Sequence, residues 1–324
     1  MNRYDIIGDV HGQADALHHL LGKLGYEKKA GSWQHLEGRK VIFLGDFVDI
    51  GPGQVDVITT VRRMIDGGNA LAVMGNHELN ALAWFLPDPQ NPGEFLRPHF
   101  ADPWGAKNRH QHSAFLAEVE ADPELHREII DWFFTLPLWL ELPGIRVVHA
   151  CWHPEHVAYL RSALGDAGLL TPALMPDITP PPDEQSKPTQ DGLTLRLCVE
   201  TLTKGPELAL PTGASFLDKY GIERKHMRMR WWDSEAVTYR SAGLVDESLR
   251  RQLADVPIPT AERISTVSDK PIFIGHYWLT GPAKPLSSYV ACVDYSAGRG
   301  DRLCAYRWDG ENELTADKFV CSQV

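Results

Sequence analysis

The chain has 324 residues, of which 43% are hydrophobic and 23% are charged, a composition typical of a globular protein that buries a substantial core. Its 43 acidic and 32 basic side chains give a formal net charge of −11, and a surface of that sign repels a phosphate backbone. We therefore expect no binding to nucleic-acid polymers. No window approaches the roughly 18 consecutive apolar residues of a membrane span, and the N-terminus lacks the apolar stretch of a secretory signal, so a cytoplasmic protein without a membrane partner is expected. The five cysteines show no CxxC spacing, and their odd number predicts no disulfide framework.

The N-terminal part of the chain is predicted to alternate strands and helices. Strands are expected at residues 4–7, 41–44 and 70–74, because each is a short apolar run that ends at a glycine. Amphipathic helices are expected at 17–24 and 55–65, where apolar residues recur every three or four positions. Strands connected through helices pair in parallel, so the sequence predicts an α/β class.

Two irregular segments interrupt the rest of the chain. Residues 87–112 are rich in Pro, Asn, His and Gly and are expected to form a surface insertion, and residues 171–192 are expected to form a flexible loop. A single domain covering residues 1–324 is expected, because a candidate site residue lies beyond the second loop. The other predicted elements are a helical region at 115–134 and strands at 138–142, 146–149, 272–275, 289–294, 303–308 and 318–321.

Polar residues follow each of the first three predicted strands. Asp9 and His11 come after the first strand, Asp46 after the second and Asn76 after the third. Open α/β sheets place ligand sites at these strand ends. Mixed oxygen and nitrogen donors suit Mn²⁺, Fe or Zn²⁺ better than Ca²⁺, and a carboxylate such as Asp46 can bridge two cations about 3.5–4 Å apart. The alternatives are an ordinary polar turn for Asp9 and His11 and a helix N-cap for Asp46.

Three histidines extend this pattern. His77 follows Asn76 directly and could act as a general acid, although a turn histidine bound to backbone is the alternative interpretation. His149 and His276 each follow a short predicted strand and offer a nitrogen ligand. Because each of these histidines stands at a strand end, we expect all three at the same edge of the fold.

The motifs, taken in order, resemble those of calcineurin-like metallophosphoesterases, in the phosphoprotein phosphatase branch. The segments that carry the resemblance are DVHG at 9–12, GDFVD at 45–49, GNHE at 75–78, LPL at 136–138, VHA at 148–150 and GH at 275–276. The opening segment also resembles bacterial members of the branch, including bis(5′-nucleosyl) tetraphosphatases. Any one motif is weakly specific, whereas the ordered set is highly specific.

The resemblance implies a β-sandwich flanked by helices, with a dinuclear metal site at the C-terminal ends of strands. Two divalent transition metal ions are implied, Mn²⁺ first and Fe or Zn²⁺ as alternatives. Asp46 would bridge them, while His77, oriented by Asp49, would protonate the leaving oxygen as an activated water attacks phosphorus. The metal ligands that the resemblance implies are Asp9, His11, Asp46, Asn76, His149 and His276.

Two residues near the motifs bear on the site, and the first of them departs from the family pattern. Ile50 stands where many relatives have an arginine that contacts the substrate phosphate. Arg109, or Arg230 with its neighbour Arg228, could supply that contact, although a solvated surface is the alternative interpretation for all three. Cys151 has no evident base beside it and is interpreted as a buried thiol near the metals.

Three functions are consistent with these residues. The first is hydrolysis of a phosphomonoester, as in serine/threonine phosphatases, with a phosphorylated protein or a small phosphorylated metabolite as substrate. The second is hydrolysis of a dinucleoside polyphosphate, which uses the same metal chemistry and is not separated from the first by the motifs. The third is a catalytically inactive binding module, which is disfavoured because every implied ligand is retained together with His77 and Asp49.

Overall fold

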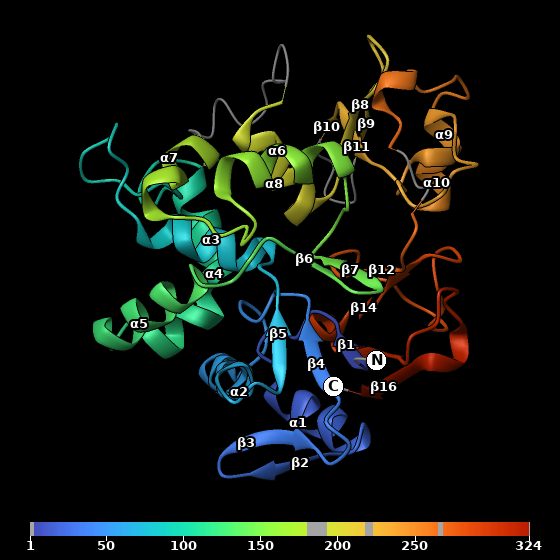
Figure 1. Ribbon diagram of the computed structural model, residues 1–324. Coiled ribbons are helices and arrows are strands. Elements are labelled where there is room, and N and C mark those ends of the chain that lie inside the picture. The colour runs from blue at the N-terminus through green and yellow to red at the C-terminus, as the bar shows by residue number, and fades with distance from the viewer. Residues whose placement is uncertain (1–2, 180–192, 218–222, 265–267, 324) are drawn as a thin grey trace.

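The computed structural model describes residues 3–179, 193–217, 223–264 and 268–323. Two β-sheets lie at its centre (Figure 1). The larger sheet has the order β14-β15-β1-β4-β5, with β16 beside β15, and the smaller has the order β13-β12-β7-β6. The strands of the larger sheet are β1 (Tyr4–Ile7), β4 (Lys40–Phe43), β5 (Ala70–Ala72), β14 (Asp294–Tyr295), β15 (Arg302–Trp308) and β16 (Phe319–Gln323). Those of the smaller sheet are β6 (Trp139–Leu142), β7 (Ile145–Val148), β12 (Ile272–Ile274) and β13 (Val290–Cys292).

The strand directions follow the sequence prediction. Strands β1, β4 and β5 are parallel, as are β7, β12 and β13. Strand β15 pairs antiparallel with β1 and with β14. The carboxyl ends of the parallel strands therefore bring their following loops to one edge of the fold.

The two sheets pack face to face and share a core. Ile6 and Ile42 of the larger sheet belong to the same buried cluster as Val147 and Phe273 of the smaller one. Ile7, which points to the opposite face of β1, packs instead with the helices. Both faces of β1 are therefore covered: its charged Asp5 pairs with Arg39 at 3.0 Å, and its isoleucines are fully buried. Each fully buried side chain of this size stabilises the fold by roughly 1.5–3 kcal/mol.

Helices cover the outer faces of the sheets. Helix α1 (Ala14–Lys23) and helix α2 (Gln54–Asp66) confirm the two predicted amphipathic helices. The others are α3 (Asn76–Phe85), α4 (Trp104–Val119), α5 (Pro123–Phe133), α6 (Pro154–Leu164), α7 (Met175–Ile178), α8 (Leu195–Lys204), α9 (Tyr239–Ala242) and α10 (Glu247–Arg250), with 3₁₀ turns at Pro172–Leu174, Thr260–Glu262, Ala297–Arg299 and Ala316–Lys318. None of the described helices is long and apolar enough to cross a bilayer.

The prediction of an irregular insertion at 87–112 is wrong for its last third, because α4 begins at Trp104. The buried face of α4 includes Asn108 and His112 as well as Phe115, so its amphipathic pattern is hidden by polar residues. The expected loop at 171–192 begins with short helical turns at Pro172–Leu174 and α7, and residues 180–192 lie outside the described part of the chain.

Three small antiparallel strand pairs are separate from the two main sheets. Strands β2 (Tyr26–Lys29) and β3 (Ser32–His35) form one hairpin, and β9 (Phe216–Leu217) pairs with β10 (Glu223–Arg224). Strand β8 (Glu207–Ala209) pairs with β11 (His226–Arg228). These pairs were not predicted, because none of them carries a long apolar run.

A disulfide joins the last two strands of the larger sheet. Cys304 of β15 and Cys321 of β16 lie opposite each other in the register of the pair and are bonded. This corrects the expectation that no cysteines pair. The remaining cysteines, Cys151, Cys198 and Cys292, are buried thiols.

Candidate metal centre and catalytic site

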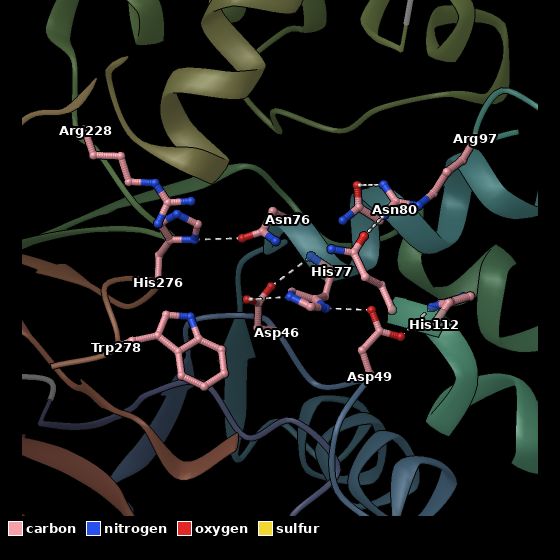
Figure 2. Close-up of a pocket in the computed structure, with 11 residues that line it drawn as sticks. Asp46, Asp49, Asn76, His77, Asn80, Arg97, His112, Arg228, His276 and Trp278 are labelled. Atoms are coloured by element: carbon pink, nitrogen blue, oxygen red, sulfur yellow. Dashed lines mark hydrogen bonds and ion pairs between the residues drawn. The ribbon is translucent and has the colours of Figure 1, made fainter. Parts of the chain in front are cut away.

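The loops after β4, β5 and β12 meet at a cavity of about 220 Å³ (Figure 2). Asp46 follows β4, Asn76 begins the helix that follows β5, and His276 follows β12, and all three line this cavity. The structure therefore brings together side chains that are up to 230 positions apart in the chain, at the strand ends where the sequence placed them.

Asp46 lies at the centre of the site. Its Oδ2 atom is 3.4 Å from His149 Nε2, 3.8 Å from His11 Nε2 and 3.9 Å from His77 Nε2. Two groups of donor atoms, each within 4.8 Å of one another, share this carboxylate: His11 with His77, and His149 with His276. A carboxylate shared by two donor groups is what a bridging ligand requires.

Asn76 completes the second group. Its Oδ1 atom lies 2.7 Å from His276 Nδ1 and 3.2 Å from His149 Nε2. The other ring nitrogen of His149 donates to the carbonyl of Leu44 at 2.6 Å, and that of His11 donates to the carbonyl of Val48 at 2.8 Å. Because these backbone bonds occupy Nδ1, Nε2 is the nitrogen of each ring that faces the site and could bind a cation.

Asp9 contacts the loop after β12. Its Oδ2 accepts a hydrogen bond from the backbone N–H of His276 at 2.9 Å. Within the described residues, the buried atoms Asp9 Oδ1, His11 Nε2 and His276 Nε2 have no hydrogen-bond partner. Burying such atoms unpaired costs about 1–3 kcal/mol each, whereas a cation would satisfy them. The donor set, with both oxygen and imidazole nitrogen, fits a divalent transition metal.

The backbone at the site adopts costly conformations. His11, Asp46, Asp49 and His276 have positive φ angles of 49°, 50°, 92° and 72°. Non-glycine residues in this region cost of order 1–3 kcal/mol each and persist only where the surroundings enforce them. The strain here is concentrated at residues that the sequence singled out for chemistry.

Glu78 enforces part of this conformation. Its buried carboxylate accepts hydrogen bonds from the backbone N–H groups of Asp46 and Phe47, both at 2.7 Å, and of Gly75 at 2.9 Å. Burial, together with the charge of Asp46, raises the pKa of Glu78 to about 7. Glu78 therefore ties the loop after β4 to the loop after β5. Glu78 is the last residue of the GNHE segment at 75–78, and no role for it was predicted from the sequence.

His77 and Asp49 form a hydrogen-bonded pair. His77 Nδ1 lies 2.6 Å from Asp49 Oδ2. Burial disfavours the charged imidazole, but Asp46 and Asp49 outweigh it and raise the pKa of His77 to about 9. An imidazole that holds its proton at neutral pH, and is held by a carboxylate, can act as a general acid.

His112 is a site residue that the sequence did not predict. Its Nδ1 bonds to the second oxygen of Asp49, so one carboxylate holds two histidines. Although burial favours the neutral acid, His112 and His77 hold the pKa of Asp49 well below its usual value. His112 was not predicted because it lies in the part of α4 that was expected to be irregular.

The two arginines chosen from the sequence do not line the cavity. Arg109 lies on the exposed side of α4, where it pairs with Glu120 at 2.8 Å. Arg230 bonds to the carbonyl of Ser241 and lies 3.8 Å from Asp233. Arg228, which the sequence offered as the neighbour of Arg230, does line the cavity, together with Arg97, which the sequence did not offer. Arg97 sits in the irregular part of the insertion, where no periodic pattern indicates the direction of a side chain.

Cys151 is a fully buried thiol, as the sequence predicted. Burial raises its pKa well above the usual value, so the thiol stays protonated. A protonated, buried thiol is a poor nucleophile.

The fold and the site define a metal-dependent hydrolase of phosphate esters. Residues 3–162 match the calcineurin-like phosphoesterase family. A protein of Oceanobacillus iheyensis named bis(5′-nucleosyl)-tetraphosphatase PrpE [asymmetrical] is 32% identical over 187 residues, which cover 57% of this chain and 69% of the relative. The protein of the same name from Halalkalibacterium halodurans is 49% identical over 75 residues, which cover 23% of this chain and 30% of the relative.

The chain therefore belongs to the calcineurin-like phosphoesterase family, which confirms the resemblance of the motifs. Its members are metal-dependent hydrolases, so this chain is an enzyme that acts on phosphorylated substrates with divalent metal ions. A solved structure described as a putative diadenosine tetraphosphatase aligns with 99% of this chain and 93% of its own, at 16% identity and a TM-score of 0.44.

Proposed function

We propose that the chain is a two-metal hydrolase with Mn²⁺ as its working ion. The observation that carries the proposal is the position of Asp46 between two groups of donor atoms. The ligands of the two ions are Asp9, His11, Asp46, Asn76, His149 and His276. A bound pair of divalent ions would polarise the phosphate oxygens and lower the pKa of an attacking water.

The residues around the ions supply proton transfer and orientation. His77, which carries a proton at neutral pH, donates it to the leaving oxygen. Asp49 holds the imidazole in place through the 2.6 Å bond to Nδ1. His112 restrains Asp49 from the other side, which keeps the acid in one orientation.

The substrate that these residues suit best is a dinucleoside polyphosphate. Arg97 and Arg228 line the cavity, and no ion pair with a carboxylate is seen for either among the described residues. Two guanidinium groups without an ion-pair partner in a protein of net charge −11 favour a substrate with several phosphates. The names of the two relatives support this substrate class.

A phosphomonoester is the second candidate substrate, as in serine/threonine phosphatases. The volume of the cavity, about 220 Å³, favours it, because the space suits ions and one phosphate better than an extended ligand. A dinucleoside polyphosphate would have to place both nucleosides outside this cavity.

The test compares kcat/KM of the Mn²⁺-loaded protein for diadenosine tetraphosphate, a phosphopeptide and an aryl phosphate. Preference for the dinucleotide supports the proposed substrate, and preference for the phosphopeptide supports the second candidate. A chelator should abolish each activity, and Mn²⁺ should restore it. Activity that resists the chelator would contradict a metal-dependent mechanism.

A further inference from the structure

Arg97 is held by neutral groups alone. Its guanidinium donates to Asn80 Oδ1 at 2.9 Å and to Gln111 Oε1 at 2.6 Å (Figure 2). Within the described residues no carboxylate pairs with it, and its buried Nε has no hydrogen-bond partner. Burying a cation is unfavourable unless an anion compensates it. Arg97 is therefore oriented by two amides and feels the charge of Asp49 without forming an ion pair with it, so its guanidinium stays available to a ligand.

The position of Arg97 relative to the general acid decides which part of a substrate it meets. Arg97 and Asn80 lie on the side of His77 where Asp49 and His112 are found, whereas Arg228 lies beside His276 on the other side (Figure 2). Asn80 follows His77 by three positions on α3, so the two side chains share a face of the helix. The acid protonates the leaving oxygen, so the leaving group departs on the side of Arg97.

A second cavity continues in this direction. Arg97 and Asn80 also line a neighbouring cavity of about 70 Å³, together with Trp104, Glu200 and Lys204. Arg97 thus stands between the space where the phosphate is attacked and a space that could receive the remainder of the leaving group. Ile50, at the position of the family arginine, packs instead beside Gly298.

We propose that Arg97, oriented by Asn80 and Gln111, binds a phosphate of the leaving group, so that the bond cleaved joins two phosphorus atoms through oxygen. This inference rests on the proposed two-metal hydrolysis and deepens it by naming the leaving group. The oxygen of water forms a bond to phosphorus, and the bond from that phosphorus to the bridging oxygen breaks. The electron pair stays on the bridging oxygen, which takes the proton of His77, and the surplus proton of water passes to solvent.

The central experiment replaces Arg97 by glutamine and compares two substrates. The leaving group of diadenosine tetraphosphate carries phosphate, whereas the leaving group of 4-nitrophenyl phosphate, 4-nitrophenolate, carries none. The Arg97→Gln variant should lose about 10²–10³-fold in kcat/KM for the dinucleotide, as expected when one charged donor to the reacting region is removed. The loss for the aryl phosphate should be smaller by a factor of at least about 30.

The matched control is Arg109→Gln, because Arg109 lies on the surface of α4 and pairs with Glu120. It should leave both activities at the wild-type level. The Arg97→Lys variant keeps the charge but cannot reach both amides, so its loss for the dinucleotide should be intermediate. Thermal melting of each variant shows whether the protein is folded.

A second measurement does not use the dinucleotide. Inorganic tripolyphosphate should compete with 4-nitrophenyl phosphate, and its inhibition constant should rise about tenfold or more in Arg97→Gln. An unchanged inhibition constant would overturn the proposal, and so would equal losses on the two substrates, since Arg97 would then act on the transferred phosphoryl group. The proposed function itself fails in a different way, through the absence of chelator-sensitive activity in the wild type on either substrate.

Discussion

His77 lies close both to Asp49, which orients it, and to Asp46 at the centre of the site. Its proposed role as an acid rather than a ligand leads to a prediction. The His77→Asn variant should keep its metal content, because the implied ligands are other residues, and should lose roughly 10²–10⁴-fold in turnover. The loss should be greatest for substrates with poor leaving groups. Metal analysis and steady-state kinetics on a series of aryl phosphates would measure both effects.

The contrasting variant is Asp46→Asn, which weakens the carboxylate shared by the two donor groups. It should lose metal together with activity. Asp66→Asn, at the exposed end of α2, serves as the control and should change neither. If His77→Asn emptied the site as Asp46→Asn does, His77 would be a ligand and the proton would have to come from another group.

At the residue scale, the sequence indicated candidate ligands but not their supports. Asp46, Asn76 and His276 each follow a short apolar run and line the cavity, and Asp9 accepts a hydrogen bond from the backbone N–H of His276. Arg97, by contrast, lies in a segment without periodicity, and its direction depends on contacts made by other elements. A side chain whose position is fixed by tertiary contacts leaves no local signal in the sequence.

At the scale of elements, the parallel strands of both sheets were predicted, because most of their residues are apolar and buried. Helix α4 was missed in its first half for the opposite reason. Its buried face carries Asn108, which bonds to the carbonyl of Pro98, and His112, which bonds to Asp49. A helix that turns polar groups toward a functional site loses the apolar stripe by which it would be recognised.

The loops at the strand ends depend on Glu78, and this leads to a second prediction. The Glu78→Gln variant would turn an acceptor into a donor facing backbone N–H groups of Asp46, Phe47 or Gly75. The unfolding free energy should fall by about 1–3 kcal/mol, and metal affinity should fall with it. Urea unfolding and metal titration would test both. Glu128→Gln on the exposed side of α5 is the control, and an equal effect there would contradict the role of Glu78.

The packing of α5 gives a third prediction, concerning pH. His126 lies between the rings of Phe85 and Phe115, and burial, aided by the charge of His112, lowers its pKa to about 4. An unfolded histidine titrates near 6.5, so the unfolded state binds the proton first as the pH falls. The stabilisation is fully present above about pH 6.5 and is lost as the pH falls toward 4.

The measurement is the midpoint of urea unfolding at several pH values between 7.5 and 5. His126→Leu should make the decline shallower, because it removes a group that must remain neutral in the folded state. His110→Leu, which changes an exposed residue of α4, should leave the decline as in the wild type. An identical decline in both variants would assign the effect to other groups.

At the scale of the whole molecule, the site joins the two sheets. Asp46 follows a strand of the larger sheet, whereas His149 and His276 follow strands of the smaller one. Ions held by ligands from both sheets bind the folded state and not the unfolded one, so they stabilise it. A chelator should therefore lower the melting temperature by several degrees, as expected for an effect of about 2–3 kcal/mol in a chain of this size.

The control for this prediction is the Asp46→Asn variant, which should melt at the same temperature with and without chelator. Added Mn²⁺ should raise the melting temperature of the wild type in proportion to the logarithm of the ion concentration, as measured by calorimetry. If neither chelator nor Mn²⁺ changed the melting temperature of the wild type, the prediction would be contradicted, and the two sheets would be held together by packing alone.

The positive φ angles at His11, Asp46, Asp49 and His276 have a consequence for the engineering of this protein. Glycine adopts such angles at no steric cost, so glycine at any of these positions would relax the backbone while deleting a functional side chain. In the absence of metal, greater stability and loss of catalysis would then arise from the same substitution. A library selected for resistance to heat without metal would therefore lose catalysis while keeping the fold.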